Sequence, residues 1–272
     1  MDAIEITDTA FLLTSARISS VTLEGVRLFN DISREGLLAL IRFWRENEFL
    51  FLRNALTADA MSLLNKRITY NDMTCRNDPR QFYRVHNDES SASFIASFLA
   101  ASQSYYSAIL AVDIAPAYAF AMKYIKDSDM EPHYDNYNNP ISSTVCYHFS
   151  PDHLSNPIYV DRARFENPYP RRVTVKDRNG IPVENVVEMN LRAGDVAVFR
   201  GRNHLHWRKF VADEMDYRAL LLHFSDYKFK GTLLSGADQV LNIEPGLIDF
   251  DNYDDFRRKY AMYFSSNGQS WI

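Results

Sequence analysis

Two stretches in the first third of the chain carry apolar residues at helical spacing. In residues 33 to 47 the apolar positions follow Ser33, a residue type that often caps the start of a helix, so an amphipathic helix is predicted there. Residues 91 to 111 show the same spacing and predict a second helix. Between them the apolar run 49–52 predicts a strand, and a short helix is expected to begin near Thr57. The first third is therefore predicted to be mostly helix with one strand.

The pattern changes near Ala117, where short β-branched or aromatic segments begin, separated by Pro, Asn, Asp and Gly. The segments read AYAFAMKYI, ISSTVCYHF, NPIYV, RRVTV, ENVVEMNL, DVAVF and YRALLLHF. Asn179-Gly180 is the strongest hairpin signal, because both residues tolerate the positive φ of a type I′ turn. Strands without helices between them favour an antiparallel sandwich or barrel over a parallel sheet. A last helix is predicted from about residue 253 to 264.

Composition adds that the chain is a packed globular protein rather than a disordered one. Its 272 residues can bury a core without crosslinks, and 18 Phe and 16 Tyr stand against only 9 Gly. Cys75 and Cys146 form no CxxC pair and are expected to be small buried thiols, which fits a reducing, cytoplasmic location. The acidic N-terminus lacks the basic region of a signal peptide, and no apolar run is long enough to cross a membrane.

The charge distribution argues against two classes of partner. The net charge is −5, and no stripe of Lys and Arg alternates with aromatic residues. We therefore expect neither nucleic acid nor an anionic membrane surface as a partner, and instead expect a small molecule. The oligomeric state has no signature in the sequence.

His133 and Asp135 follow the predicted strand AYAFAMKYI and a polar turn. Residues two apart on a strand project to the same side, so this imidazole and this carboxylate could bind one ion. Taken alone, a His-x-Asp pair is better explained by a surface histidine beside a turn aspartate. His86 and Asp88 form a competing pair, but it precedes a predicted helix, where Asp88 or Ser90 is favoured as a helix cap.

A second histidine pair lies further along, in DVAVFRGRNHLHWRKFV. A buried strand and a polar bend lead to His204 and His206, which share the same parity and could both face one site. Arg218 then begins the apolar segment YRALLLHF. A buried guanidinium is costly unless it has an anionic partner, so Arg218 is expected to bind an anion.

Together these motifs resemble the 2-oxoglutarate-dependent Fe(II) oxygenase superfamily, including its phytanoyl-CoA-hydroxylase-like small-molecule branch. That family carries His-x-Asp, a distal His after a strand, and an Arg roughly ten residues beyond; here they read PHYD, AGDVAVFRGRNHLHWR and DYRALLLHF. The resemblance implies a mainly β fold with flanking helices, a double-stranded β-helix (jelly-roll, cupin-like). A single domain 1–272 would then comprise a helical lead-in over 1–116, the jelly-roll core over 117–226 and a helical tail over 227–272.

The resemblance also implies roles for individual residues. His133, Asp135 and His206 would bind Fe(II), and Arg218 would pair with the distal carboxylate of the cosubstrate 2-oxoglutarate. Two imidazoles and one carboxylate leave three positions on the ion open, for the keto acid and for dioxygen. The planar fork of an arginine suits a carboxylate. Tyr124 would donate to the cosubstrate carboxylate, with a core tyrosine as the equal alternative.

Several assignments remain open from the sequence. His206 stands where the family places its distal ligand, and His204 would instead line the pocket or lie in a solvated loop. Arg208 lies two residues after His206, so on a strand the two side chains project to the same side. Arg208 could therefore reach the same cavity and bind an acidic substrate group, or it could pair with Asp213 or Glu214.

Other polar residues near the motifs have simpler interpretations. His148 and His223 are expected to be hydrogen-bonded core residues, and His153 a loop residue. Some polar residues could touch substrate, although a polar turn explains them as well; they are Tyr134, Asn136, Asn138, Arg200 and Asn203.

The resulting hypothesis is an Fe(II)/2-oxoglutarate dioxygenase acting on an amino-acid-like or natural-product-like metabolite. Related halogenases lack the carboxylate ligand, so Asp135 favours hydroxylation or desaturation. One alternative is a cupin-fold metal enzyme that does not use 2-oxoglutarate and would not require Arg218. Another is a non-catalytic jelly-roll binding domain, in which the histidines are incidental.

Overall fold

A computed structural model describes residues 8–70, 89–135, 140–164, 173–174, 183–211 and 213–226. The helices are α1 (Asp8–Ser19), α2 (Arg34–Asn47), α3 (Ala58–Arg67) and α4 (Glu89–Leu110), with a short 3-10 turn η2 (Val183–Asn185). The strands are β1 (Thr22–Leu23), β2 (Val26–Arg27), β3 (Phe49–Leu52), β4 (Ile114–Tyr124), β5 (Met130–Tyr134), β6 (Ile141–Ser150), β7 (Ile158–Arg164), β8 (Val173–Thr174), β9 (Val186–Met189), β10 (Val196–Phe199), β11 (His204–Arg208) and β12 (Asp216–Asp226).

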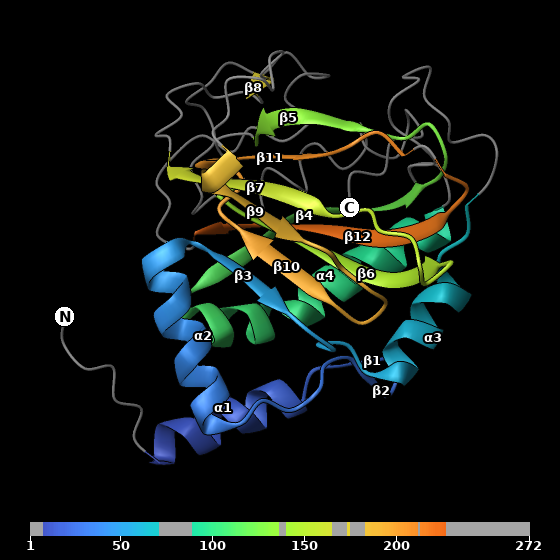
Figure 1. The fold of residues 1–272 in the computed structure, drawn as a ribbon. Helices are drawn as coiled ribbons and strands as arrows, with labels where there is room; N and C mark the ends of the chain where they lie inside the picture. Colours follow the sequence, from blue (N-terminus) through green and yellow to red (C-terminus); the bar gives the residue numbers. More distant parts are fainter. Residues whose placement is uncertain are drawn as a thin grey trace, which may run out of the picture.

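Two antiparallel sheets form the centre of the molecule (Figure 1). One has the strand order β3-β10-β6-β12-β4, and the other has the order β8-β5-β11-β7-β9. Strands that are neighbours in the sheets come from distant parts of the sequence, because the chain alternates between the two layers as a jelly roll does. The predicted double-stranded β-helix is therefore confirmed.

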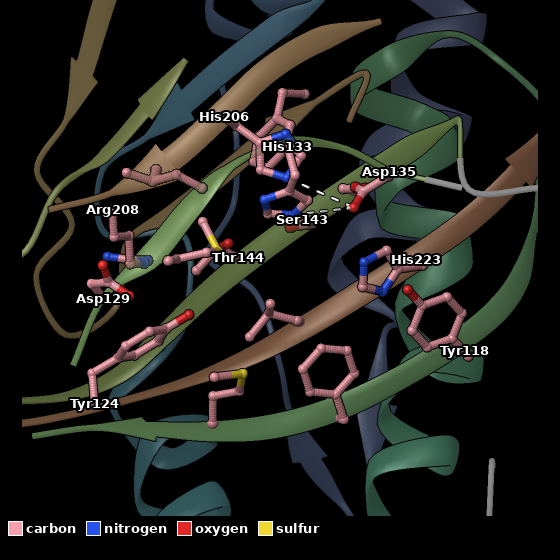
Figure 2. Close-up of a pocket in the computed structure, with 17 residues that line it drawn as sticks. Tyr118, Tyr124, Asp129, His133, Asp135, Ser143, Thr144, His206, Arg208 and His223 are labelled. Atoms are coloured by element: carbon pink, nitrogen blue, oxygen red, sulfur yellow. Dashed lines mark hydrogen bonds and ion pairs between the residues drawn. The ribbon is translucent and has the colours of Figure 1, made fainter. Parts of the chain in front are cut away.

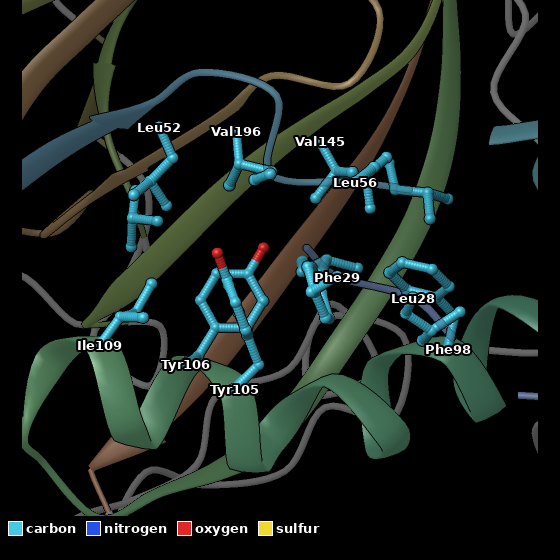
Figure 3. Close-up of a cluster of buried hydrophobic side chains, with 14 of the residues drawn as sticks. Leu28, Phe29, Leu52, Leu56, Phe98, Tyr105, Tyr106, Ile109, Val145 and Val196 are labelled. Atoms are coloured by element: carbon cyan, nitrogen blue, oxygen red, sulfur yellow. The ribbon is translucent and has the colours of Figure 1, made fainter. Parts of the chain in front are cut away.

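The helices cover the outer face of the first sheet, where most of the apolar surface is buried (Figures 1 and 3). Phe29 lies at the centre of this layer and stacks on Tyr105 with ring centroids 3.8 Å apart. Tyr106, next on α4, reaches the sheet and shares a hydrogen bond of 2.7 Å with the hydroxyl of Ser143 on β6. This packing fixes the first sheet from outside, so its inner face can line a cavity.

A second apolar cluster fills the space between the sheets. It includes Met122 on β4, Phe149 on β6, Val160 on β7 and Phe199 on β10, all buried. Side chains alternate between the two faces of each strand, so β6 and β10 contribute to both clusters.

The three helices predicted in the first third of the chain are confirmed, with small shifts of their ends. The helix expected over 33–47 is α2, and the hydroxyl of Ser33 caps it by accepting a hydrogen bond of 3.0 Å from the amide of Gly36. The helix near Thr57 is α3, capped in the same way through the amide of Ala60 at 3.0 Å. The helix expected from residue 91 begins two residues earlier, as α4.

Other expectations differ from the structure in detail. The sequence pattern did not predict α1, because its apolar residues lie on more than one side, with Leu12 and Leu13 exposed. The β-rich core was expected to begin at Ala117, but β4 begins at Ile114. In addition, β3 from the lead-in belongs to the first sheet, since it pairs with β10.

Some predicted features fall outside the described residues, namely the Asn179-Gly180 turn and the helix over 253–264. Within the described part of the chain, no helix is both long and apolar enough to cross a membrane.

Candidate functional site

Three buried side chains, two on neighbouring strands and one directly after a strand, converge between the sheets. His133 on β5 and His206 on β11 are cross-strand partners, with ring centroids 4.1 Å apart. Asp135 follows β5 directly. His133, Asp135 and His206 are 5%, 8% and 3% exposed. Their ligand atoms all lie within 4.8 Å of one another, so one metal ion could contact all three.

Backbone hydrogen bonds orient both imidazoles toward the carboxylate. The Nδ1 of His133 lies 2.8 Å from the carbonyl of Glu131, and the Nδ1 of His206 lies 3.0 Å from the carbonyl of His204. A carbonyl oxygen can only accept, so we assign the proton of each neutral ring to Nδ1. The Nε2 atoms then face Asp135 Oδ1 at 3.6 and 3.7 Å with a free lone pair, which is the form that binds a metal.

Asp135 is the ionised member of this group. Burial alone would raise its pKa, but the charges that His206 and His133 carry when they are protonated outweigh burial, so the pKa of Asp135 is lowered. Its negative charge requires compensation in this buried position, which protonated imidazoles or a bound cation could provide.

The three residues open onto a cavity of about 100 Å³ between the sheets (Figure 2). In Figure 2, Arg208, Asp129 and Tyr124 lie at one end of the cavity, and His223 and Tyr118 lie at the other, beyond Asp135. The remaining lining residues are Phe120, Met122, Met130, Ser142, Ser143, Thr144, Ile158, Phe199 and Leu221, together with His133 and His206. The cavity therefore has a charged end, at Arg208 and Asp129, and an aromatic end, at His223 and Tyr118.

The Arg208 end is the closed one. Arg208 on β11 is 1% exposed, and its guanidinium donates to the hydroxyl of Tyr217 at 2.9 Å and to the carbonyl of Asn156. Its carbon Cζ also lies 4.8 Å from the ring centroid of Tyr124. At the opposite end, Tyr118 is only half buried.

Arg208 is a buried positive charge; none of its hydrogen bonds goes to a carboxylate of the described residues, although Asp129 lines the same end of the cavity. Burial alone would lower its pKa, but the neighbouring oxygens of Tyr217 and Tyr124 raise it, so Arg208 stays charged. The pairing with Asp213 or Glu214 considered from the sequence does not form, and Glu214 lies 3.7 Å from Lys126 instead. A buried guanidinium in this situation is stabilised by an anion bound beside it.

Arg218 does not line the cavity, contrary to the expectation from the sequence. It lies on the opposite face of β12, where its guanidinium donates to both carboxylate oxygens of Asp216, at 2.9 and 2.7 Å, and to Asn65 at 3.4 Å. The side chains that β12 turns to the cavity are those of Leu221 and His223. The anionic partner that Arg218 requires is therefore a residue of the same strand.

His204 does not join His133, Asp135 and His206. Its Nδ1 lies 2.9 Å from the carbonyl of Asp161, and its Nε2 lies 3.8 Å from Glu48. His204 contributes to the site through its backbone, since its carbonyl orients His206.

The remaining candidates are distributed as follows. Tyr124 lines the cavity beside Arg208, and its donation to a cosubstrate carboxylate stays a prediction. Tyr134 packs against the separate cluster of Tyr159 and Trp207 instead. Arg200 pairs with Glu48, His153 is exposed, and Asn203 and His148 do not line the cavity. His86, Asp88, Cys75, Asn136 and Asn138 lie outside the described residues.

Several residues that line the cavity were not predicted from the sequence. His223 was expected in the core, but it lines the cavity and stacks on Tyr118, with ring centroids 4.0 Å apart. Ser142, Thr144 and Asp129 were not singled out. Strand parity could have selected Ser142 and Thr144 only with knowledge of which face of β6 is turned inward, and Asp129 lies before β5, where no parity applies.

No protein-family model and no curated protein matches the sequence. The fold resembles solved structures. One is the non-heme alpha ketoglutarate dependent epimerase SnoN from nogalamycin biosynthesis (12% identity, TM-score 0.56, 79% of this chain and 92% of that chain covered). Another is the carbocyclase SnoK from the same biosynthesis (13%, 0.53, 79% and 92%). A third is HygX from Streptomyces hygroscopicus with nickel, 2-oxoglutarate and hygromycin B bound (15%, 0.51, 73% and 89%). At these identities the likeness concerns the fold, which is the jelly roll described above.

Proposed function

We propose that this protein is a non-haem Fe(II) enzyme that uses 2-oxoglutarate and dioxygen to oxidise a small organic molecule. The observation that carries the proposal is the convergence of His133, Asp135 and His206 in one buried cavity. The fold supports it, because the similar structures include alpha ketoglutarate dependent enzymes.

The donor set suits a ferrous ion. Two neutral imidazoles and one carboxylate are the ligands of this class of iron site, and they occupy one side of the ion. The orienting bonds from Glu131 and His204 would hold both rings in the metal-binding tautomer. Bound there, Fe(II) would supply the activation of dioxygen, coupled to the oxidative decarboxylation of the keto acid.

Arg208 is our candidate for the residue that binds the distal carboxylate of 2-oxoglutarate, in place of Arg218. It follows His206 by two residues on the same strand and lines the same cavity. Alternate residues of a strand are about 7 Å apart, a span that a five-carbon diacid can bridge while its keto acid faces the metal. Tyr124, whose ring lies beside the guanidinium, is positioned to donate its hydroxyl to the same carboxylate.

The opposite end of the cavity would then receive the substrate. Its described lining is mainly aromatic and apolar, with Tyr118, Phe120 and Leu221 only half buried. This lining favours a substrate that presents an apolar or ring-bearing part to the metal. The HygX structure holds hygromycin B, and SnoK and SnoN belong to nogalamycin biosynthesis, which supports a natural-product-like metabolite over a macromolecule.

Hydroxylation or desaturation is the proposed outcome, because Asp135 occupies the position that a halide would need. A metal enzyme that does not use 2-oxoglutarate is less well supported, since it would leave the buried charge of Arg208 unused.

Succinate formation tests the proposal. Protein loaded anaerobically with Fe(II) is mixed with 2-oxoglutarate and air, and succinate is measured with and without a panel of ring-bearing metabolites. We expect iron-dependent succinate in wild-type protein and none in His206→Ala. Stoichiometric iron binding without any succinate would favour a metal enzyme of another class.

A further inference from the structure

The carboxylate of Asp135 is held from a second side by the opposite sheet. Ser142 on β6 is buried, and its hydroxyl donates to Asp135 Oδ2 at 2.5 Å. The other oxygen, Oδ1, faces the two histidines. Since a hydroxyl bound to one carboxylate oxygen fixes the rotation of the group, the two oxygens have separate partners.

Gly201 closes the space around the same oxygen. A Cβ atom at this position would lie 2.0 Å from Asp135 Oδ2, 2.9 Å from Asp135 Cγ and 2.5 Å from Ser142 Oγ. Such distances do not occur between non-bonded atoms, so any side chain at residue 201 would displace the carboxylate. The glycine is required by this close approach of the carboxylate to the backbone.

The turn that contains Gly201 is anchored by backbone hydrogen bonds and an ion pair, and not by the carboxylate of Asp135. The carbonyl of Gly201 accepts a hydrogen bond of 2.8 Å from the amide of Asp135. Arg200 forms an ion pair with Glu48 at 2.8 Å, and its amide donates to the Glu48 carbonyl at 3.0 Å. The position of Gly201 is therefore set by the end of α2, not by the carboxylate it contacts.

We propose that Ser142 and Gly201 are positioning residues that hold Asp135 Oδ2 away from the metal and present Oδ1 alone. This inference rests on the proposed function. A carboxylate that offers one oxygen takes one coordination position, which preserves the three open positions that the keto acid and dioxygen require. Ser142 and Gly201 act on the ion only through Asp135.

Calorimetric titration with Mn²⁺, in the absence of any cosubstrate, tests the inference. Loss of a group that hydrogen-bonds a metal ligand typically weakens metal binding by roughly 10- to 100-fold, and we expect this loss for Ser142→Ala. Gly201→Ala should lose at least as much, because the new Cβ displaces the ligand itself. Ser142→Thr keeps the hydroxyl and should restore most of the affinity.

Ser143→Ala is the matched control. Ser143 is the next residue on β6. It borders the cavity, but its buried hydroxyl bonds to Tyr106 and to the carbonyl of Ala197 and not to Asp135 or a histidine. We expect Ser143→Ala to lower the melting temperature of the metal-free protein without changing Mn²⁺ affinity. If Gly201→Ala does not fold, Ser142→Ala and Ser142→Thr decide the question.

The outcomes separate the two proposals. Wild-type affinity in Ser142→Ala, or an equal loss in Ser143→Ala, would overturn the positioning role while the metal site stands. A wild-type protein that binds no Mn²⁺ would overturn the metal site itself, and the inference with it.

Discussion

His133 and His206 are direct cross-strand partners on β5 and β11, although they come from distant parts of the sequence. The register of the two strands places the ring centroids 4.1 Å apart, and Asp135, which completes the group, follows β5 directly. The separation of the two histidines is therefore fixed by backbone hydrogen bonds of one sheet, which gives the site a rigid base.

Replacing either histidine should abolish metal binding. We expect His133→Ala and His206→Ala to lose stoichiometric Mn²⁺ binding, because two ligands cannot hold the ion as three do. His204→Ala is the control, since it removes a neighbouring buried imidazole but keeps the carbonyl that orients His206. Metal content measured after dialysis compares the three variants. Loss of metal in His204→Ala alone would reverse the assignment of the distal ligand.

Arg208 and Arg218 should differ in their effect on the cosubstrate. Arg208→Met is expected to weaken 2-oxoglutarate binding to the Mn²⁺-loaded protein by about 2–5 kcal/mol, the usual cost of removing one partner of a buried charge pair. Arg218→Met should leave the affinity unchanged, because Arg218 lies outside the cavity. Calorimetric titration measures both. The reverse order of effects would restore Arg218 to the role suggested by the family resemblance.

The pair of Arg218 and Asp216 should make a pH-dependent contribution to stability. Burial alone would raise the pKa of Asp216, but the hydrogen bond and charge of Arg218 outweigh it and lower the pKa below its ordinary value of 3.8. A carboxyl group whose pKa is lowered on folding stabilises the protein above its unfolded-state pKa, and this contribution is lost as the pH falls through the folded-state value.

We therefore expect Arg218→Met to be less stable than wild type at neutral pH, by less than about 1 kcal/mol because the pair is partly solvated. The difference should shrink as the pH falls below 3.8. Urea unfolding at several pH values measures it. A difference that is constant with pH would indicate that Arg218 stabilises the fold through packing rather than through Asp216.

Phe29 should be a major contributor to the stability of the fold. It is fully buried between Tyr105, Tyr106 and Phe98 in the layer between the helices and the first sheet. Phe29→Ala is expected to lower the free energy of unfolding by about 3–5 kcal/mol. Phe43→Ala on the exposed side of α2 is the control and should cost far less. Comparable losses in both variants would contradict the placement of this core.

The pairing of His133 with Asp135 could be predicted from the sequence because its geometry is local. His133 and Asp135 are two residues apart at the end of a strand, so their convergence needs no knowledge of the rest of the fold. The choice of His206 over His204 came from the family resemblance. In the structure His206 lies with His133 and Asp135, whereas His204 is turned toward Glu48; metal binding by His206 stays a prediction.

Arg218 could not be placed from the sequence because β12 is covered on both faces. Helices pack on one side of β12 and the second sheet lies on the other, so apolar residues occur at every position from Ala219 to Leu222. Such an unbroken apolar run does not show which alternate residues of the strand face the cavity. Ser142 and Gly201 were missed for another reason. Their importance comes from contacts with Asp135 across the two sheets, and no local pattern encodes such a contact.

The most direct measurement is an anaerobic titration of the Fe(II)-loaded protein with 2-oxoglutarate, followed by visible absorption. Chelation of a ferrous ion by a keto acid produces a charge-transfer band that neither component shows alone. We expect the band to saturate at one equivalent in wild-type protein, to be absent in His206→Ala and to require much more cosubstrate in Arg208→Met. A wild-type protein that binds iron but forms no band, or a band unaffected by His206→Ala, would contradict the proposed site.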